Sequence, residues 1–174
     1  LSLERPLHEL LEYARFAGAE PARQLTARLV LSHQTGLPNW GGEVLEFGFE
    51  PGDAFGYSGE GYLYLQRVVE RLTGLPLEAL VEREVFEPLG MTRSRLTWDE
   101  SRAPRLAIGH DEAGSPRQRN PPEVNAAGSL FTTAEEYARF AIAMLDAEGL
   151  DPGTVELAFE PAVRMRGDER GYAR

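Results

Sequence analysis

The strongest constraint on the fold is an amphipathic pattern over residues 59–73, GEGYLYLQRVVERLT. Its apolar side chains recur every three or four residues, which is the period of an α-helix, and charged side chains fall on the opposite side. Gly74 follows, and glycine is the residue that most often ends a helix. We therefore predict a helix over 59–73 whose buried face contains Tyr62, Leu65, Val68, Val69 and Leu72.

The segment in front of this helix is the second informative feature. A Pro-Gly pair at positions 51–52 indicates a turn, which leads to the sequence Tyr57-Ser58-Gly59 at the start of the helix. A buried helix fixes the direction of its first residues, so Tyr57 is expected to be held on a rigid element. Such a placement suits a catalytic or a binding group.

Composition limits the possible partners and chemistries. With 174 residues and 42% hydrophobic content, the chain can form one domain with its own core. Its net charge of -10 argues against nucleic acid or an anionic membrane as a partner, and no apolar run approaches the ~18 residues of a membrane span. The sequence has no cysteine, and all 18 basic residues are arginine. Thiol chemistry and any mechanism that needs a lysine cannot be completed within it.

Weaker patterns predict an α+β fold that is predominantly helical. Further helices are expected over residues 6–15, 27–32, 76–86, 133–145 and 154–159, where Thr26 and a Thr133-x-x-Glu136 capping box mark two of the starts. Short strands at 95–97 and 106–110 would supply the β part, with a hairpin-like turn at 111–115. Residues 164–174 are a polar tail.

Several apparent sites have simpler structural explanations. His8, His33 and His110 are too far apart in the sequence for a helix-face pair of metal ligands, so we predict no metal and no cofactor. His33 is expected to hydrogen-bond within its own turn. Glutamates 135 and 136 lie in the first turn of a capped helix, where capping and the helix dipole account for both. Residues 56–60 miss the G-x-S-x-G nucleophile motif by one position.

Three blocks of the sequence resemble one family, in the family's order and at about its spacing. They are LVLSHQTGLPNW (29–40), FEPGDAFGYSGEGYLYLQRVVERLTGLPLEALVEREVFEPLGMTRS (49–94) and NAAGSLFTTAEEYARF (125–140). Together they are similar to the superfamily of serine β-lactamases, penicillin-binding proteins and esterases, most of all to its class C branch. The resemblance implies the helical lobe and flanking parts of the β-lactamase/DD-peptidase-like fold, as a single partial domain over residues 1–174.

The resemblance also implies a chemistry. Family members carry a serine in an S-x-x-K motif that is acylated by an ester, peptide or β-lactam carbonyl, and a lysine and a tyrosine activate it. Tyr57 falls on the catalytic tyrosine, and Gly59 falls on a substrate-binding position where the family usually has asparagine. Trp40 falls where related enzymes line the mouth of the cleft. Both aromatic residues could instead be packing residues. The missing asparagine favours an esterase-like or peptidase-like role over β-lactam hydrolysis.

Neither S-x-x-K nor the family's K-T-G motif can occur in a sequence without lysine. We therefore expect an internal segment of a larger serine hydrolase, inactive by itself, with the nucleophile helix and the C-terminal sheet motif outside it. Its substrate would be a small molecule or a peptide. The alternative is a non-catalytic relative that binds a peptide or a cell-wall fragment. An unrelated helical interaction domain would require the three blocks to match by coincidence. Substrate, oligomeric state and compartment stay open.

Overall fold

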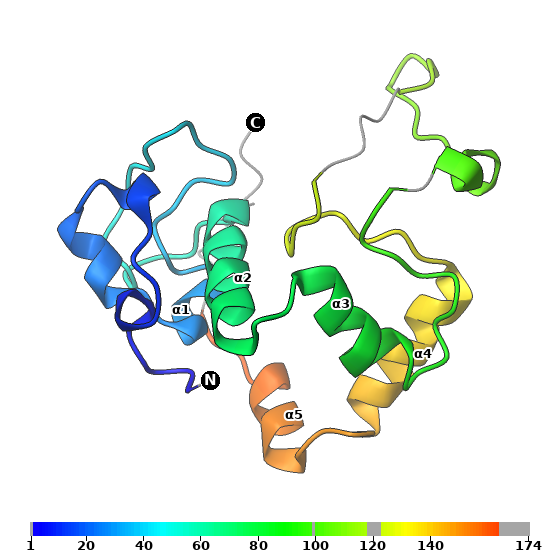
Figure 1. Cartoon of the computed structure of the whole chain (residues 1–174). Helices are drawn as coiled ribbons and strands as arrows, with labels where there is room; N and C mark the ends of the chain where they lie inside the picture. Colours follow the sequence, from blue (N-terminus) through cyan, green and yellow to red (C-terminus); the bar gives the residue numbers. More distant parts are fainter. Residues whose placement is uncertain (1, 99, 118–122, 164–174) are drawn as a thin grey trace.

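A computed structural model describes residues 2–98, 100–117 and 123–163. The long helix α2, Gly59–Thr73, lies between the N-terminal part of the chain on one side and helices α3 and α4 on the other (Figure 1). The described elements are, in order, 3-10 helices at Leu7–Glu9, Ala14–Phe16 and Glu20–Gln24, α1 at Ala27–Leu31, α2, α3 at Leu77–Val81, a π-helical turn at Glu82–Phe86, a 3-10 helix at Glu100–Arg105, α4 at Ala134–Leu145 and α5 at Pro152–Phe159.

The predicted bounds of α2 are confirmed, and interactions within one turn explain them. Ser58 has an extended backbone, and its hydroxyl oxygen accepts a hydrogen bond of 2.9 Å from the N–H of Gly61, which caps the N-terminus. At the other end Gly74 adopts the left-handed conformation with φ of 70°. Its N–H donates to the carbonyl of Glu70 at 2.9 Å. This bond satisfies one of the carbonyls in the last turn that have no N–H partner within the helix.

The buried face of α2 differs from the predicted one. Of the five residues expected there, only Val68 is fully buried, and Leu72 is 49% exposed. The most deeply buried large side chain of the helix is instead Tyr64. Apolar residues occur on several sides of this helix, and the N-terminal segment packs on the side where the hydroxyl of Tyr64 can donate to the carbonyl of Leu11, at 2.8 Å.

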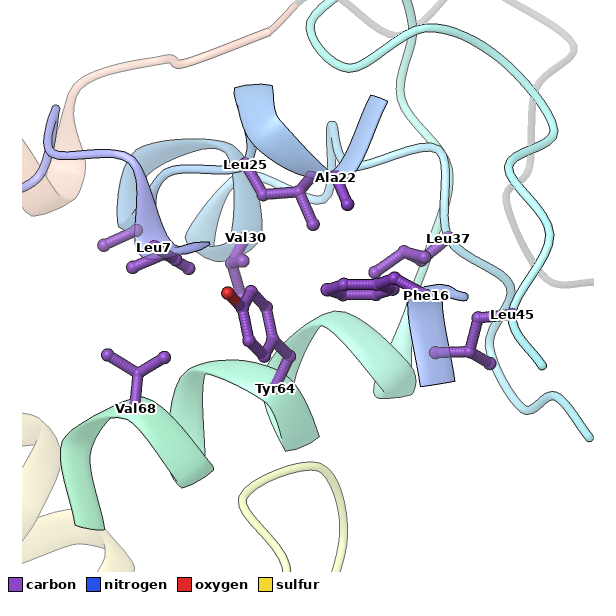
Figure 2. Close-up of a cluster of buried hydrophobic side chains, with 10 residues drawn as sticks. Leu7, Phe16, Ala22, Leu25, Val30, Leu37, Leu45, Tyr64 and Val68 are labelled. Carbon is purple, nitrogen blue, oxygen red and sulfur yellow. The ribbon is translucent and has the colours of Figure 1, made fainter. Parts of the chain in front are cut away.

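The core beside α2 is built mainly from the N-terminal segment. The ring of Phe16 meets the ring of Tyr64 edge-on with 4.9 Å between centroids, and Tyr13 stacks on Tyr64 at 5.2 Å. Burial raises the pKa of Tyr64 to about 12, so its hydroxyl remains a hydrogen-bond donor at neutral pH. Figure 2 shows Tyr64 and Val68 projecting from α2 into the cluster, which is completed by Leu7, Ala22, Leu25, Ala27, Val30, Leu37 and Leu45.

The helix predicted over residues 6–15 is wrong. This segment forms two short 3-10 helices, Leu7–Glu9 and Ala14–Phe16, with a non-helical stretch between them. In a continuous α-helix the carbonyl of Leu11 would accept a hydrogen bond from the backbone N–H of Arg15, four residues later. Here it accepts from the side chain of Tyr64 instead. A long-range hydrogen bond and the core packing around it therefore outweigh the local helical preference.

The other predicted helices are present with small changes. The hydroxyl oxygen of Thr26 accepts from the N–H of Leu29 and caps α1, although Leu31, expected to face the core, is 50% exposed. The helix expected over 76–86 begins as α3 and continues as the π-helical turn. The helix expected over 154–159 forms the larger part of α5.

The β part of the α+β prediction is not formed as strands in the described part of the chain. Only isolated bridges occur there: Pro6 with Thr26, Arg95 with Phe131 and His110 with Pro116. The α+β prediction is therefore confirmed only in its helical part. The hairpin-like turn is present, because the N–H of Asp111 donates to the carbonyl of Ser115 at 3.0 Å. The tail at 164–174 lies outside the described residues.

The carboxylate of Glu136 binds another segment of the chain, which corrects the prediction that capping and the helix dipole account for this residue. Thr133 caps the helix as expected, since its hydroxyl oxygen accepts from the N–H of Glu136. The carboxylate of Glu136 is 1% exposed and faces another segment. It accepts hydrogen bonds from the N–H of Arg93 at 2.9 Å and from the hydroxyl of Ser94 at 2.7 Å. It therefore fastens α4 to the turn around residue 93.

Replacement of this carboxylate is expected to be costly. Glu136→Ala leaves the N–H of Arg93 and the hydroxyl of Ser94 without their acceptor, so the free energy of unfolding should fall by about 3 kcal/mol in urea denaturation. The matched control is Glu135→Ala, because the side chain of Glu135 is 61% exposed and its ion pairs are at the surface. That change should cost less than about 1 kcal/mol. Equal losses in the two variants would contradict the role of Glu136.

Candidate functional site

The predicted catalytic residue, Tyr57, lies in a backbone segment that His33 holds on both sides. The N–H of Gly56 donates to the carbonyl of His33 at 2.8 Å, and the N–H of Ser58 donates to the Nδ1 of His33 at 3.1 Å. The hydroxyl of Ser58 also donates to the carbonyl of Pro38 at 2.9 Å. These bonds fix the direction in which Tyr57 leaves the chain, and its side chain is 41% exposed.

His33 itself has an unusual conformation that makes this arrangement possible. Its backbone is left-handed, with φ of 56°, which turns the chain so that the imidazole faces the segment in front of α2. The imidazole packs against the ring of Tyr57 at 4.4 Å between centroids and against the ring of Tyr62 at 5.1 Å. The expectation that His33 hydrogen-bonds within its own turn is therefore wrong, because its ring acceptor serves Ser58.

The charge state of His33 limits what it can do chemically. Burial lowers its pKa below the ordinary value of 6.5, so the imidazole is neutral at neutral pH. Since Nδ1 accepts from Ser58, the ring proton is carried by Nε2. Burial, followed by the nearby Tyr57, raises the pKa of Tyr62. His33 thus orients Tyr57 but supplies no positive charge to it at neutral pH.

An ion pair fixes the loop on the other side of the corner that Tyr57, Ser58 and Gly59 form at the start of α2. Glu60 is 3% exposed, and its two carboxylate oxygens accept from the guanidinium of Arg15 at 2.5 and 3.0 Å. The same carboxylate accepts from the N–H of Gly41 at 2.9 Å, and Arg15 donates to the carbonyl of Gly42 at 2.6 Å. Hydrogen bonds to Glu60 and then to Tyr13 raise the pKa of Arg15. The pair ties the loop that carries Trp40 to the start of α2.

Gly59 and Trp40, the two predicted substrate-binding residues, are brought into contact. A Cβ atom added to Gly59 would lie 3.0 Å from Cη2 of Trp40 and 2.8 Å from the carbonyl oxygen of Asn39. Glycine is therefore required here by the close approach of the loop, whatever its role toward a substrate. The side chain of Trp40 is 57% exposed, so its ring partly covers the helix start and partly faces solvent.

Sequence reasoning missed one residue of this corner, Asn39. Its backbone carbonyl accepts from the N–H groups of Gly59 and Glu60 at 3.1 and 3.2 Å, and its side-chain Oδ1 accepts from Gly59 at 3.1 Å. Asparagine in a loop is common, so nothing in the local pattern singled it out. Its place beside Trp40, in a block that resembles the family, was the only available signal.

Two absences can be stated for the part of the chain that the structure describes. Within residues 2–98, 100–117 and 123–163, no group of three or more His, Asp or Glu side chains is arranged to hold a metal ion. None of the helices described there is long and apolar enough to cross a membrane.

Comparisons with known proteins identify the family. Residues 1–172 match the Beta-lactamase family, and the chain belongs to it. Penicillin-binding protein 4 of Amycolatopsis lactamdurans is 28% identical over 98% of this chain and 51% of its own length. The lovastatin esterase of Penicillium rubens (strain ATCC 28089 / DSM 1075 / NRRL 1951 / Wisconsin 54-1255) is 26% identical over 80% of this chain and 45% of its own length. The chain thus spans about half the length of these relatives.

The fold agrees with this assignment. A mutant of a class C β-lactamase has the same fold with a TM-score of 0.72, over 91% of this chain and 48% of that one, at 20% identity. The resemblance of the three sequence blocks to the superfamily of serine β-lactamases, penicillin-binding proteins and esterases is therefore confirmed. The chain is part of a hydrolase family.

The lowered pKa of His33 predicts a pH dependence of stability. The unfolded chain binds a proton at His33 near pH 6.5, whereas the folded protein binds it only at lower pH. The contribution of His33 to the free energy of unfolding should therefore be fully present above pH 6.5 and should be lost as the pH falls toward the lowered pKa. His33→Asn keeps an acceptor and tolerates the left-handed backbone, so this part of the slope should disappear.

Urea denaturation between pH 4.5 and 8 measures this slope. His110→Asn is the matched control, because His110 is exposed and should leave the slope unchanged. A slope that persists in His33→Asn would show that other groups cause it.

The close approach at Gly59 predicts that alanine is not tolerated there. Alanine ordinarily favours a helix over glycine by up to about 1 kcal/mol. At this position its Cβ would meet the backbone oxygen of Asn39, so Gly59→Ala should instead lower the free energy of unfolding by about 1 to 2 kcal/mol. Gly42→Ala, where a Cβ meets open space, should be nearly neutral. Thermal denaturation compares the two, and a stabilised Gly59→Ala would refute the close approach.

Proposed function

We propose that the parent of this chain is a serine hydrolase that forms an acyl-enzyme on an ester or peptide carbonyl, with Tyr57 as general base and proton relay. One observation carries the proposal: the half-exposed phenol of Tyr57 leaves a backbone that His33 holds on both sides. A proton-transfer group must reach the reacting atoms from a fixed position, and this geometry meets that requirement. The corner would form one wall of the active cleft.

The proposed reaction has two stages. A serine hydroxyl attacks the carbonyl carbon, Tyr57 as phenolate takes the serine proton, and it passes that proton to the leaving group as the acyl bond breaks. Water then attacks the acyl-enzyme and gives a proton to Tyr57, which returns it to the serine oxygen. The carboxylic acid product leaves, and the tyrosine is again a phenolate.

The serine and an activating lysine would come from outside these residues. A phenolate at neutral pH needs nearby positive charge, and the chain contains no lysine to supply it. His33 is neutral at this pH, and Arg15 is engaged by Glu60. The relatives' greater length is consistent with a nucleophile helix and a sheet motif in the remainder of a longer parent.

The expected substrate is an ester or a peptide more than a β-lactam. Gly59 has no side-chain amide at the position where the family usually has asparagine, which favours an esterase-like or peptidase-like role. The relative named lovastatin esterase supports an ester. A non-catalytic protein that binds a peptide or a cell-wall fragment is the second candidate, and Gly59 together with the absence of lysine favours it.

The decisive test uses Tyr57→Phe in the full-length protein. Loss of the proton-transfer group should lower kcat for a nitrophenyl ester by ~100-fold or more, the usual scale for a positioned acid or base. Tyr62→Phe is the matched control, because the hydroxyl of Tyr62 donates to the carbonyl of Leu31 and is assigned no step. Its activity should stay within about threefold of the parent.

Two results would reject the assignment. Unchanged turnover by Tyr57→Phe would remove Tyr57 from the mechanism. A full-length protein that neither hydrolyses the ester nor is labelled by a fluorophosphonate would favour the non-catalytic binding protein.

A further inference from the structure

A cleft lies in front of α4, between segments that Figure 1 shows on the side of the molecule away from the N-terminal segment. Its volume is about 440 Å³, which is within the usual range for clefts that bind small molecules. The described lining comes from residues 92–98, from the 3-10 helix Glu100–Arg105 with the residue after it, and from residues 131–133. None of these residues belongs to the corner at the start of α2.

Two aromatic rings form one wall of this cleft. The backbones of Arg95 and Phe131 exchange two hydrogen bonds, of 2.9 and 2.8 Å, so their side chains leave the bridge on the same face. The ring of Trp98 packs against that of Phe131 with 5.4 Å between centroids, and its Nε1–H donates to the carboxylate of Glu100 at 2.6 Å. Both rings are only half-buried, so they keep surface for the ring of a ligand.

Positive charge lines the cleft, although the protein as a whole is acidic. The net charge is -10, yet the described lining contains Arg93, Arg95 and Arg105 and no aspartate or glutamate. Of these, Arg93 is paired with Glu135 and Glu136, at 2.6 and 3.3 Å. Two further carboxylates accept from neutral lining residues and lie outside the lining: Glu78, bonded to Thr97, and Glu100, bonded to Trp98.

Arg95 and Arg105 are not neutralised in this way. Among the described residues, no carboxylate accepts from either guanidinium. Arg95 donates to the carbonyl of Ser94 at 2.5 Å, which fixes its direction and leaves it further N–H donors. The side chain of Arg105 is exposed and has no hydrogen bond to a described residue. Two positive charges therefore stand beside the aromatic wall without a carboxylate partner.

We infer that this cleft binds an organic anion whose carboxylate or phosphate is attached to an aromatic ring. Arg95 and Arg105 bind the acidic group, because a guanidinium has several N–H donors in one plane that match carboxylate and phosphate oxygens. The ring of the ligand packs on Trp98 and Phe131. The inference goes beyond the proposed function, since it uses neither Tyr57 nor an acyl-transfer step.

Both halves of the ligand are needed. An anion without a ring gains little at exposed arginines, because water and salt screen the attraction. A neutral ring would use the aromatic wall but would leave the two guanidinium groups without an acceptor. Only a compound with both features matches the charge and the apolar surface of the cleft together.

The two tryptophans of the protein allow a direct test by NMR. Their two indole N–H signals in the 174-residue chain are assigned with Trp40→Phe. Benzoate and phenyl phosphate should shift the Trp98 signal in a saturable way and leave that of Trp40 in place, and the tighter of the two identifies the acidic group. Acetate, which has no ring, and benzamide, which has no charge, should need about tenfold higher concentrations. Equal effects of all four compounds, or equal shifts of both tryptophans, would overturn the inference.

Arg105→Gln tests the charge. Because Arg105 has no bond to a described residue, the fold is retained, and Kd for benzoate should rise about fivefold at low ionic strength and less at high ionic strength. Arg71→Gln is the matched control: Arg71 is an exposed residue of α2 outside the cleft, so this variant changes the net charge equally and should leave Kd unchanged. An unchanged Kd in Arg105→Gln, or equal weakening in both variants, would contradict the role of Arg105 and with it the inference.

Calorimetry repeats the comparison in the full-length protein. It should give the same order of affinities for the four compounds and the same loss in Arg105→Gln. Absence of binding there would also overturn the inference. Neither measurement depends on ester hydrolysis, so failure of the anion site and failure of the hydrolase proposal are separate results.

Discussion

The first turn of α2 has N–H groups that no helix carbonyl can reach, and the loop in front of it supplies their acceptors. Asn39 accepts from Gly59 and Glu60, and the hydroxyl of Ser58 accepts from Gly61. Ser58 also donates to the carbonyl of Pro38, so the loop and the helix satisfy each other's polar groups. These hydrogen bonds also fix the positions of Tyr57 and Trp40. Tyr57 directly precedes Ser58, and Trp40 directly follows Asn39.

The charged groups around this corner, Arg15 and Glu60, neutralise each other. Glu60 brings a carboxylate into the interior, and Arg15 neutralises it from a 3-10 helix of the N-terminal segment. Removal of Arg15 would leave the buried carboxylate of Glu60 without its cation. The pair also joins the N-terminal segment to the loop of Trp40, because Arg15 donates to the carbonyl of Gly42. Arg15 is engaged by Glu60, and His33 is neutral at neutral pH, so neither of these two residues supplies a free positive charge beside Tyr57. In the proposed mechanism the activating cation must come from the rest of the parent protein.

Local interactions were predictable and long-range ones were not. The bounds of α2 were correct because its caps, Ser58 and Gly74, act within one turn of the helix. Its buried face was wrong because apolar residues occur on several of its sides, and the packing of Phe16 against Tyr64 decided between them. Glu136 illustrates the same limit. Its position in a capping box was visible, whereas its bonds to the turn at Ser94 required the fold.

By itself the sequence determined the family, through three blocks in a characteristic order, and it determined where the central helix begins and ends. It also determined that no lysine is available within these residues. Only the tertiary structure showed that His33 holds the segment around Tyr57 and that the amide of Asn39 lies beside Gly59. These contacts join residues 20 or more positions apart in the chain, so they depend on how the loops close onto α2, which no local pattern of residues specifies.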